Sequence, residues 1–179
     1  NDIQPALSDT DHWQKGDLFL SFRHRSLLML YRPSTNEIIK LIQGPFSHQH
    51  DVDIYSDHEI SFFNNNAISL GTKKQLMEFG PPENQKDSLI SSEVLIYNFE
   101  TNEFSSPYKP LFEQEKIYTR TNGLHQFLSN GDVFVESFEE GKLFILEGNK
   151  VVYKNQLDTP EEDMIYIPNW MQLYEDINF

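Results

Sequence analysis

The stretch LHQFLSNGDVFVES, residues 124–137, decides the fold. Apolar and polar residues alternate on both sides of Asn130-Gly131, a dipeptide that favours the tight turn of a β-hairpin. A second stretch, KLFILEGNKVVY at 142–153, follows it and turns again through a Gly-Asn pair. The two stretches together predict four short antiparallel strands in consecutive order.

The same pair of hairpins recurs twice earlier in the chain. First hairpins are predicted from strands at 2–7 and 17–22, and at 50–55 and 59–63. Second hairpins follow them, with strands at 27–31 and 37–42, and at 94–97 and 103–104. The tripeptide Thr-Asn-Glu occupies the same place in both second hairpins, at 35–37 and 101–103. This recurrence indicates a repeat architecture.

Each unit is a four-stranded meander of roughly 45 residues, which is the size of one β-propeller blade. We therefore predict an all-β fold of β-propeller blades, each a four-stranded antiparallel meander, with about three blades and part of a fourth. A closed propeller needs at least about four blades, so we expect a portion of a larger propeller. Either further blades or a second chain would complete it. The alternative is a sandwich or barrel of about twelve short strands.

The whole chain, residues 1–179, is predicted to form one partial propeller domain. The expected parts are blade 1 at about 1–44, blade 2 at about 45–110 with an insert at 69–92, blade 3 at about 118–155, and a closing segment at 156–179. The insert contains Pro81 and Pro82 and is predicted to be a surface excursion. Apart from a helical turn in this insert, no helix is expected.

The composition excludes several kinds of function. The sequence has 28 acidic and 14 basic residues, a formal net charge of −14, so its surface should repel phosphate backbones and nucleic-acid binding is not expected. It has no cysteine, which removes thiolate nucleophiles, thiolate metal ligands and disulfides. No apolar run approaches the roughly 18 residues of a membrane-spanning helix, so no span is expected.

The polar residues of the innermost strands are the candidate site, because these strands line the central channel of a propeller. His48 and His50 occupy alternate positions of the predicted strand 46–52 and should point to the same face. Such a pair could bind a divalent metal, but no further ligand is evident from the spacing, and no metal or cofactor is predicted. The imidazoles could instead act as nucleophile or general base, or form hydrogen bonds inside a wet channel.

Other candidates take equivalent places. His125 opens the inner strand of the third blade and is expected to share a face with His50. Arg23 follows the second strand of the first blade, and Asn1 lies just ahead of that blade's inner strand. A guanidinium binds two oxygens of a sulfate or phosphate at once, so an arginine near a histidine suits the transfer of an anionic group. The alternative for Arg23 is an exposed loop cation.

Several short elements occur in an order that is typical of one family. They are NDIQP at 1–5, GDLFLSFR at 16–23, QHD at 49–51 after a Gly-Pro pair, ISFFNN at 60–65, and an aromatic segment at 165–174 centred on Trp170. Together they resemble the C-terminal portion of the aryl sulfotransferase family of six-bladed β-propellers. The chain departs from the family pattern where FNNN at 63–66 replaces Phe-Asp-Asn-Gly.

The resemblance implies transfer of a sulfuryl group from an aryl sulfate to a phenolic acceptor through a transiently sulfated histidine. It implies His50 as the nucleophile, with Arg23 and Asn1 binding the sulfuryl oxygens. His125 is expected to assist departure of the phenolate, and His48 and Asp51 to contact substrate. Because bacterial members of the family are typically exported, a periplasmic or extracellular location is expected.

Two other functions stay open at the level of the sequence. The first is a non-catalytic propeller that binds a ligand or a protein partner, because fold does not determine function. The second is another propeller enzyme, such as a hydrolase or lyase. Glycoside hydrolysis would need two carboxylates facing the channel, and only Asp51 and Asp53 fit this loosely.

Overall fold

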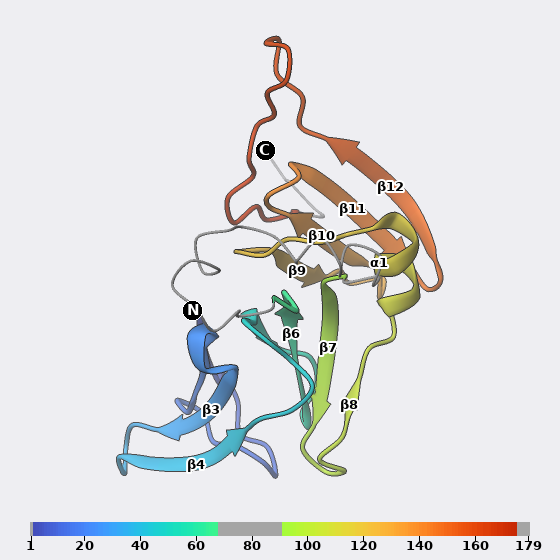
Figure 1. Ribbon diagram of the computed structural model, residues 1–179. Coiled ribbons are helices and arrows are strands. Elements are labelled where there is room, and N and C mark those ends of the chain that lie inside the picture. The colour runs from blue at the N-terminus through green and yellow to red at the C-terminus, as the bar shows by residue number, and fades with distance from the viewer. Residues whose placement is uncertain (1, 68–90, 175–179) are drawn as a thin grey trace.

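Three four-stranded antiparallel sheets make up most of the protein (Figure 1). The structure is a computed structural model that describes residues 2–67 and 91–174, so most of the predicted insert lies outside the described residues. In every sheet the strands neighbour one another in chain order. The prediction of an all-β fold built from blade-like meanders is therefore confirmed.

The strands follow the predicted hairpins closely. The first sheet contains β1 (Asp2–Pro5), β2 (Leu18–Phe22), β3 (Leu27–Arg32) and β4 (Glu37–Ile42). The second contains β5 (His50–Ile54), β6 (Glu59–Asn64), β7 (Glu93–Asn98) and β8 (Phe104–Ser105). The third contains β9 (Leu124–Phe127), β10 (Val133–Ser137), β11 (Lys142–Glu147) and β12 (Lys150–Gln156).

Two helical elements join these strands. A 3-10 turn, η1 (Arg23–Arg25), connects β2 to β3, and an α-helix, α1 (Lys109–Glu115), leads from the second sheet to the third. The expectation that no helix lies outside the insert is wrong. Proline is tolerated in the first turn of α1, and Leu111 and Phe112 are buried between the second and third sheets. Burial in tertiary contacts thus supports a helix too short to form alone.

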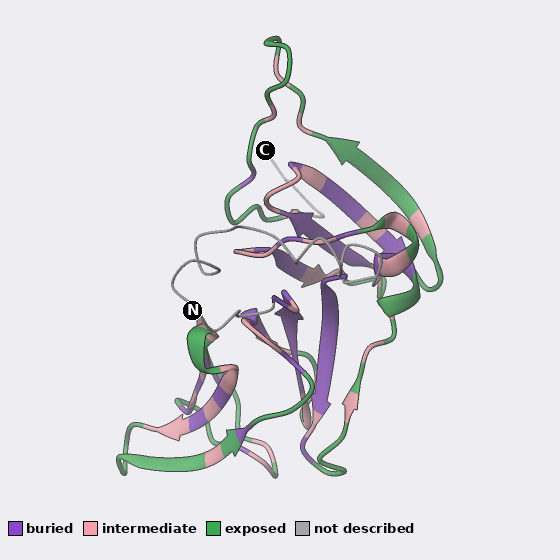
Figure 2. Ribbon diagram, in the orientation of Figure 1, coloured by how far each residue is buried: buried purple, intermediate pink, exposed green. Residues whose placement is uncertain are grey.

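Two hydrophobic clusters fill the interfaces between neighbouring sheets. Phe19 of β2 and Phe62 of β6 belong to the cluster between the first and second sheets. Phe63 of β6 and Val135 of β10 belong to the cluster between the second and third. Successive residues of β6 therefore face opposite interfaces, as strand geometry requires. Burial is highest in β6, β7 and β10, whereas β4 and β12 are largely exposed (Figure 2).

The chain after β12 folds back over the far face of the third sheet (Figure 1). Leu157 and Leu173 pack against a third cluster, and an isolated bridge joins Asp158 to Ile165. We call residues 157–174 the returning segment. Among the described residues, no helix is both long enough and apolar enough to cross a membrane.

Candidate active site

A pocket of about 330 Å³ is formed by residues from four separate parts of the chain. They come from η1, from the start of β5, from the loop before β9 and from the returning segment: Arg23, His50, Thr121, Asn122 and Trp170. Four of these five side chains are polar. Segments far apart in sequence thus converge on one small polar site.

A β-bulge places His50 in this pocket. His50 pairs with Phe63 and Val52 pairs with Phe62, so Asp51 has no partner on β6 and adopts a φ of 56°. His48 lies before the strand, in left-handed backbone with a φ of 58°. The prediction that His48 and His50 alternate on one strand is therefore wrong, because β5 begins only at His50.

Asn65 determines which nitrogen of His50 carries a proton. The Asn65 amide donates to the carbonyls of Thr119 and Asn122, at 2.9 and 2.6 Å, and this fixes its orientation. Its Oδ1 then lies 2.5 Å from Nδ1 of His50 and can only accept a hydrogen bond. Nδ1 must therefore hold the proton, which leaves a lone pair on Nε2.

His50 is neutral at physiological pH. The side chain is buried, and burial lowers the pKa of His50 to about 4, with a smaller contribution from the nearby Arg23 charge. The hydrogen bond to Asn65 acts in the opposite direction without reversing the shift. A neutral imidazole whose Nε2 has no hydrogen-bond partner among the described residues can serve as a nucleophile.

Arg23 supplies a half-buried positive charge to the same pocket. Its Nη2 donates to the carbonyl of Arg120 at 3.0 Å, and its Nη1 lies 3.2 Å from Nε2 of His24. Its buried Nε has no hydrogen-bond partner within the part of the chain that the structure describes. Burial, with the nearby charge of Arg120, lowers the pKa of Arg23. Such a guanidinium has N–H groups left for an anionic ligand.

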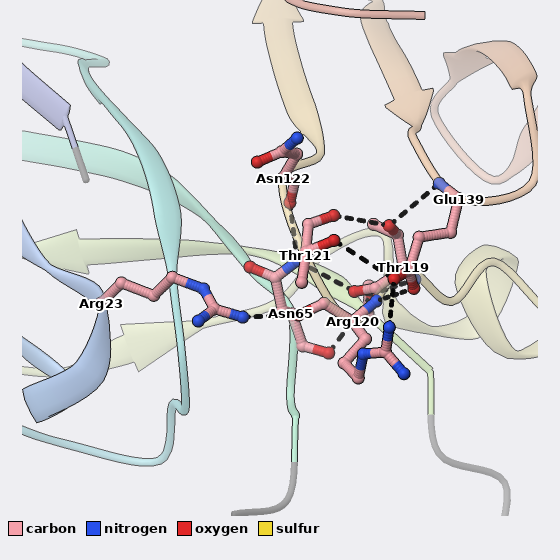
Figure 3. A network of polar contacts seen from close by, with 8 residues as sticks. Arg23, Asn65, Thr119, Arg120, Thr121, Asn122 and Glu139 are labelled. Atoms are coloured by element: carbon pink, nitrogen blue, oxygen red, sulfur yellow. Dashed lines mark hydrogen bonds and ion pairs between the residues drawn. The ribbon is translucent and has the colours of Figure 1, made fainter. Parts of the chain in front are cut away.

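A tightly held loop forms the opposite wall, and we call residues 119–123 the site loop (Figure 3). Glu139, in the turn between β10 and β11, accepts hydrogen bonds from the backbone N–H and guanidinium of Arg120 and from the hydroxyl of Thr121. Gly123 has a φ of 91°, and a Cβ there would lie 2.5 Å from the Phe63 ring. Only glycine therefore fits at this position.

Asp51 and His125 form a buried network with Ser61. The backbone N–H and Nδ1 of His125 both donate to Oδ2 of Asp51, at 2.6 and 2.8 Å, and its Nε2 lies 2.7 Å from the Ser61 hydroxyl. Burial alone would lower the pKa of His125, but the charge and hydrogen bond of Asp51, with the charges of Asp53 and Asp2, outweigh it and raise the pKa. This favours a protonated imidazole paired with Asp51.

The network joins the inner strands of all three sheets. Asp2 of β1 accepts a hydrogen bond from the backbone of Val52 in β5, at 2.9 Å. Burial raises the pKa of Asp53 to about 6, and the charges of Asp51 and Asp2 add to this effect while His125 opposes it.

Ligand atoms of Asp51, Asp53 and His125 lie within 4.8 Å of one another, a spacing that could hold a metal ion. Both nitrogens of His125 already contact protein groups, so an ion would have to displace one of them.

The predicted site residues divide into two groups. His50 and Arg23 line the pocket, whereas Asp51 and His125 lie in the buried network. His48 is not among the described residues that line the pocket: its Nδ1 contacts the Ala67 carbonyl at 3.0 Å, and burial, with the Arg23 charge, lowers its pKa. Asn1 lies outside the described residues.

Sequence reasoning did not assign a role to Asn65, Thr121, Asn122 or Trp170. Asn65 and Trp170 do fall within the family-like elements, which was the available signal for them. Thr121 and Asn122 come from a loop between sheets, and no strand pattern marks them. Their place in the pocket follows from the packing of one sheet on another.

Four-stranded meanders packed face to face, with an imidazole and a guanidinium in one polar pocket, define a β-propeller with a site suited to an anionic group. A family model described as Arylsulfotransferase (ASST) matches residues 1–155. The chain therefore belongs to the arylsulfotransferase family, as the resemblance predicted, and a general sulfotransferase-like function is supported. Neither the curated proteins nor the solved structures contain a match.

Proposed function

We propose that this chain carries the catalytic pocket of a transferase that moves a sulfuryl group from an aryl sulfate to a phenolic acceptor, with His50 as nucleophile. One observation carries the proposal: Asn65 holds the proton of His50 on Nδ1 in the pocket that also contains Arg23. Burial keeps this imidazole neutral, and the ring therefore presents the lone pair of Nε2.

In the first step, Nε2 of His50 attacks the sulfur of the aryl sulfate. An N–S bond forms while the bond between sulfur and the aryl oxygen breaks, and the aryl oxygen leaves with the electron pair as a phenolate. The imidazole ring becomes positively charged, and the Oδ1 of Asn65 stabilises this charge through the Nδ1–H bond. Because the neutral ring carries no proton on Nε2, the lone pair of this nitrogen is available for the attack.

In the second step, the oxygen of the acceptor attacks the sulfur and the N–S bond breaks. The electron pair returns to Nε2, which regenerates neutral His50, and the proton of the acceptor phenol ends on the first phenolate through solvent. Arg23 serves both steps by neutralising the sulfuryl oxygens, which is the main requirement for such transfers by analogy with phosphoryl transfer. The reaction needs no other reactant.

His125 has a different role in this proposal from the one expected from the sequence. Because both ring nitrogens of His125 contact protein groups, we propose that it acts through Asp51. Asp51 follows His50 directly and occupies the bulge that turns His50 into the pocket. His125 is then a positioning residue rather than an acid for the leaving group.

We further propose that another blade covers the outer face of the first sheet, supplied by the same protein or by a second chain. Ile3 and Phe22 are exposed there, beside a mainly apolar hollow of about 590 Å³ that Leu20 also lines. The faces that the three sheets do bury against one another are apolar in the same way. Leu20→Lys should lower the melting temperature of the protein when the covering blade is present. An unchanged melting temperature would contradict this proposal.

The catalytic proposal is tested by incubating the full chain with 4-nitrophenyl sulfate and phenol and measuring nitrophenolate release. His50→Ala should abolish turnover, and Arg23→Ala should lower it by about 10²–10³-fold. Matched controls are His58→Ala, in the β5–β6 turn, and Arg25→Ala, in η1 but not in the pocket lining. Normal turnover by His50→Ala would contradict the proposal. Absence of turnover by the unmodified chain would favour a binding module without catalysis.

A further inference from the structure

Apart from the imidazole of His50, Trp170 is the one aromatic side chain among the described residues that line the pocket. It comes from the returning segment, about 120 residues along the chain from His50 (170 against 50). The residue is 41% exposed, so Trp170 is not buried in a hydrophobic core. An exposed apolar surface therefore borders the polar groups that act on the sulfuryl group.

The backbone at Trp170 is in a conformation that bulky residues rarely adopt. Its φ is 60°, in the left-handed region that favours glycine and asparagine. Such conformations persist only where surrounding contacts enforce them, and they cluster at functional sites. Contacts with neighbouring residues must therefore hold the backbone of Trp170 in this conformation.

Glu136 of β10 provides those contacts. Its two carboxylate oxygens accept hydrogen bonds from the backbone N–H groups of Trp170 and Met171, at 3.4 and 2.8 Å. Gln126 of β9 adds two more, donating to the carbonyl of Leu173 at 2.9 Å and accepting from its N–H at 3.0 Å. The inner strands of the third sheet thus hold the returning segment on both sides of Met171.

The use of Glu136 for this purpose carries a cost. Its side chain is fully buried, and burial raises the pKa of Glu136 although the two N–H groups oppose the shift. A carboxylate removed from water is unfavourable unless its hydrogen bonds compensate. Here those bonds order the backbone beneath a side chain that remains exposed. A costly buried support under an exposed aromatic is typical of a binding surface rather than of core packing.

We infer that Trp170 is the surface on which the aromatic ring of the donor or acceptor stacks while its sulfuryl group lies at His50 and Arg23. The inference rests on the proposed function, and it adds the residue that would distinguish planar aryl sulfates and phenols from alkyl sulfates. The indole offers a flat apolar face that an aryl ring matches and a flexible alkyl chain does not. Glu136 is a positioning residue that acts through Trp170.

Calorimetric binding to the full chain tests this without catalysis, with 4-nitrophenol and inorganic sulfate as separate probes. Trp170→Ala should weaken 4-nitrophenol binding about tenfold, Trp170→Phe should restore it to within about threefold, and sulfate binding should stay unchanged. Tyr166→Ala is the matched control, because Tyr166 is an exposed aromatic of the same segment that does not line the pocket. Equal affinity of the unmodified and Trp170→Ala chains for 4-nitrophenol would overturn the inference.

Kinetics separate this inference from the proposed function. Trp170→Ala should raise the KM for 4-nitrophenyl sulfate about tenfold with little change in kcat, and the KM for hexyl sulfate should not change. A chain that binds 4-nitrophenol through Trp170 but transfers no sulfuryl group would overturn only the proposed function. Normal sulfuryl transfer with no effect of Trp170→Ala on KM would overturn only the stacking role of Trp170.

A double-mutant cycle tests the role of Glu136. Glu136→Gln keeps the shape of the side chain but loses one acceptor, so 4-nitrophenol binding should weaken several-fold. In the Trp170→Ala background the same change should have no further effect, because Glu136 acts through Trp170. Additive losses in the double variant would contradict this role, even if Glu136→Gln also lowers stability.

Discussion

Asn65 Oδ1 lies 2.5 Å from Nδ1 of His50, while the amide nitrogen of Asn65 is bound to two backbone carbonyls of the site loop. His50 begins β5 and Asn65 directly follows β6, so both come from the second sheet and its end, and the site loop, which Glu139 holds, orients Asn65 in turn. This chain of contacts explains how packing between sheets controls the chemistry of one imidazole. Each of these contacts can be tested separately by mutation.

Replacing Asn65 should change the tautomer of His50. Asn65→Leu removes the acceptor for Nδ1–H, so a fraction of the ring should carry its proton on Nε2, and kcat/KM for the donor should fall about 100-fold. Nitrogen NMR of His50 reports the tautomer directly, which a purely structural role would leave unchanged. Asn155→Ala, on the exposed β12, is the control. An Nδ1–H tautomer that persists in Asn65→Leu would contradict the assignment.

The pH profile should report the low pKa of His50. Because protonated imidazole has no lone pair on Nε2, kcat/KM for 4-nitrophenyl sulfate should be constant near neutral pH and fall only as pH decreases through about 4. Arg23 contributes to lowering this pKa, so Arg23→Ala should move the inflection to higher pH. An inflection near 6.5 in the unmodified chain would show that the ring is not buried in this way.

Two glycines with nearly equal φ provide a matched pair. Gly123→Ala should destabilise the protein by about 1–3 kcal/mol beyond Gly131→Ala, because only the former places a Cβ against Phe63. Gly131, with a φ of 90°, has nothing within 4 Å of the added Cβ and pays the backbone cost alone. Urea unfolding measures the difference. Equal losses from the two variants would mean that the site loop can move without cost.

The buried network should contribute stability at low pH that is lost as pH rises, while the lowered pKa of His50 contributes stability that increases over the same range. The folded-state pKa values of Asp53 and His125 are both raised, so each contributes stability at low pH that is lost as pH rises through its folded pKa. For Asp53 this loss falls between about pH 4 and 6. Asp53→Asn should remove this contribution, so the stability of the variant relative to the unmodified chain should rise between about pH 4 and 6, whereas Asp163→Asn, at an exposed position, should show no such change. Urea unfolding from pH 4 to 7 measures this, and parallel curves for Asp53→Asn and the unmodified chain would contradict it.

The sequence predicted the strands well because their signals are local. Alternation and turn residues placed β4 at 37–42, as observed, and the three sheets at the expected repeats. α1 was missed because a short helix that begins around a proline has little local signal, and its stability comes from burial of Leu111 and Phe112.

The site was only partly predictable. The family-like elements pointed to His50 and Arg23, and the structure brings both to one pocket. The bulge at Asp51 could not be predicted, and without it His48 and His50 were expected on one face. The site loop and Trp170 enter the pocket through packing between sheets and through the bonds of Glu139 and Glu136, which no pattern along a single strand encodes.

The central claim is that His50 carries the sulfuryl group between donor and acceptor. Its most direct test is mass spectrometry of the full chain after rapid mixing with 4-nitrophenyl sulfate in the absence of any phenolic acceptor. We predict one added SO₃ group on Nε2 of His50, retained in His48→Ala, absent in His50→Ala and discharged when phenol is added. A sulfuryl group on another residue, or transfer to phenol without any sulfated intermediate in His50→Ala, would contradict the account.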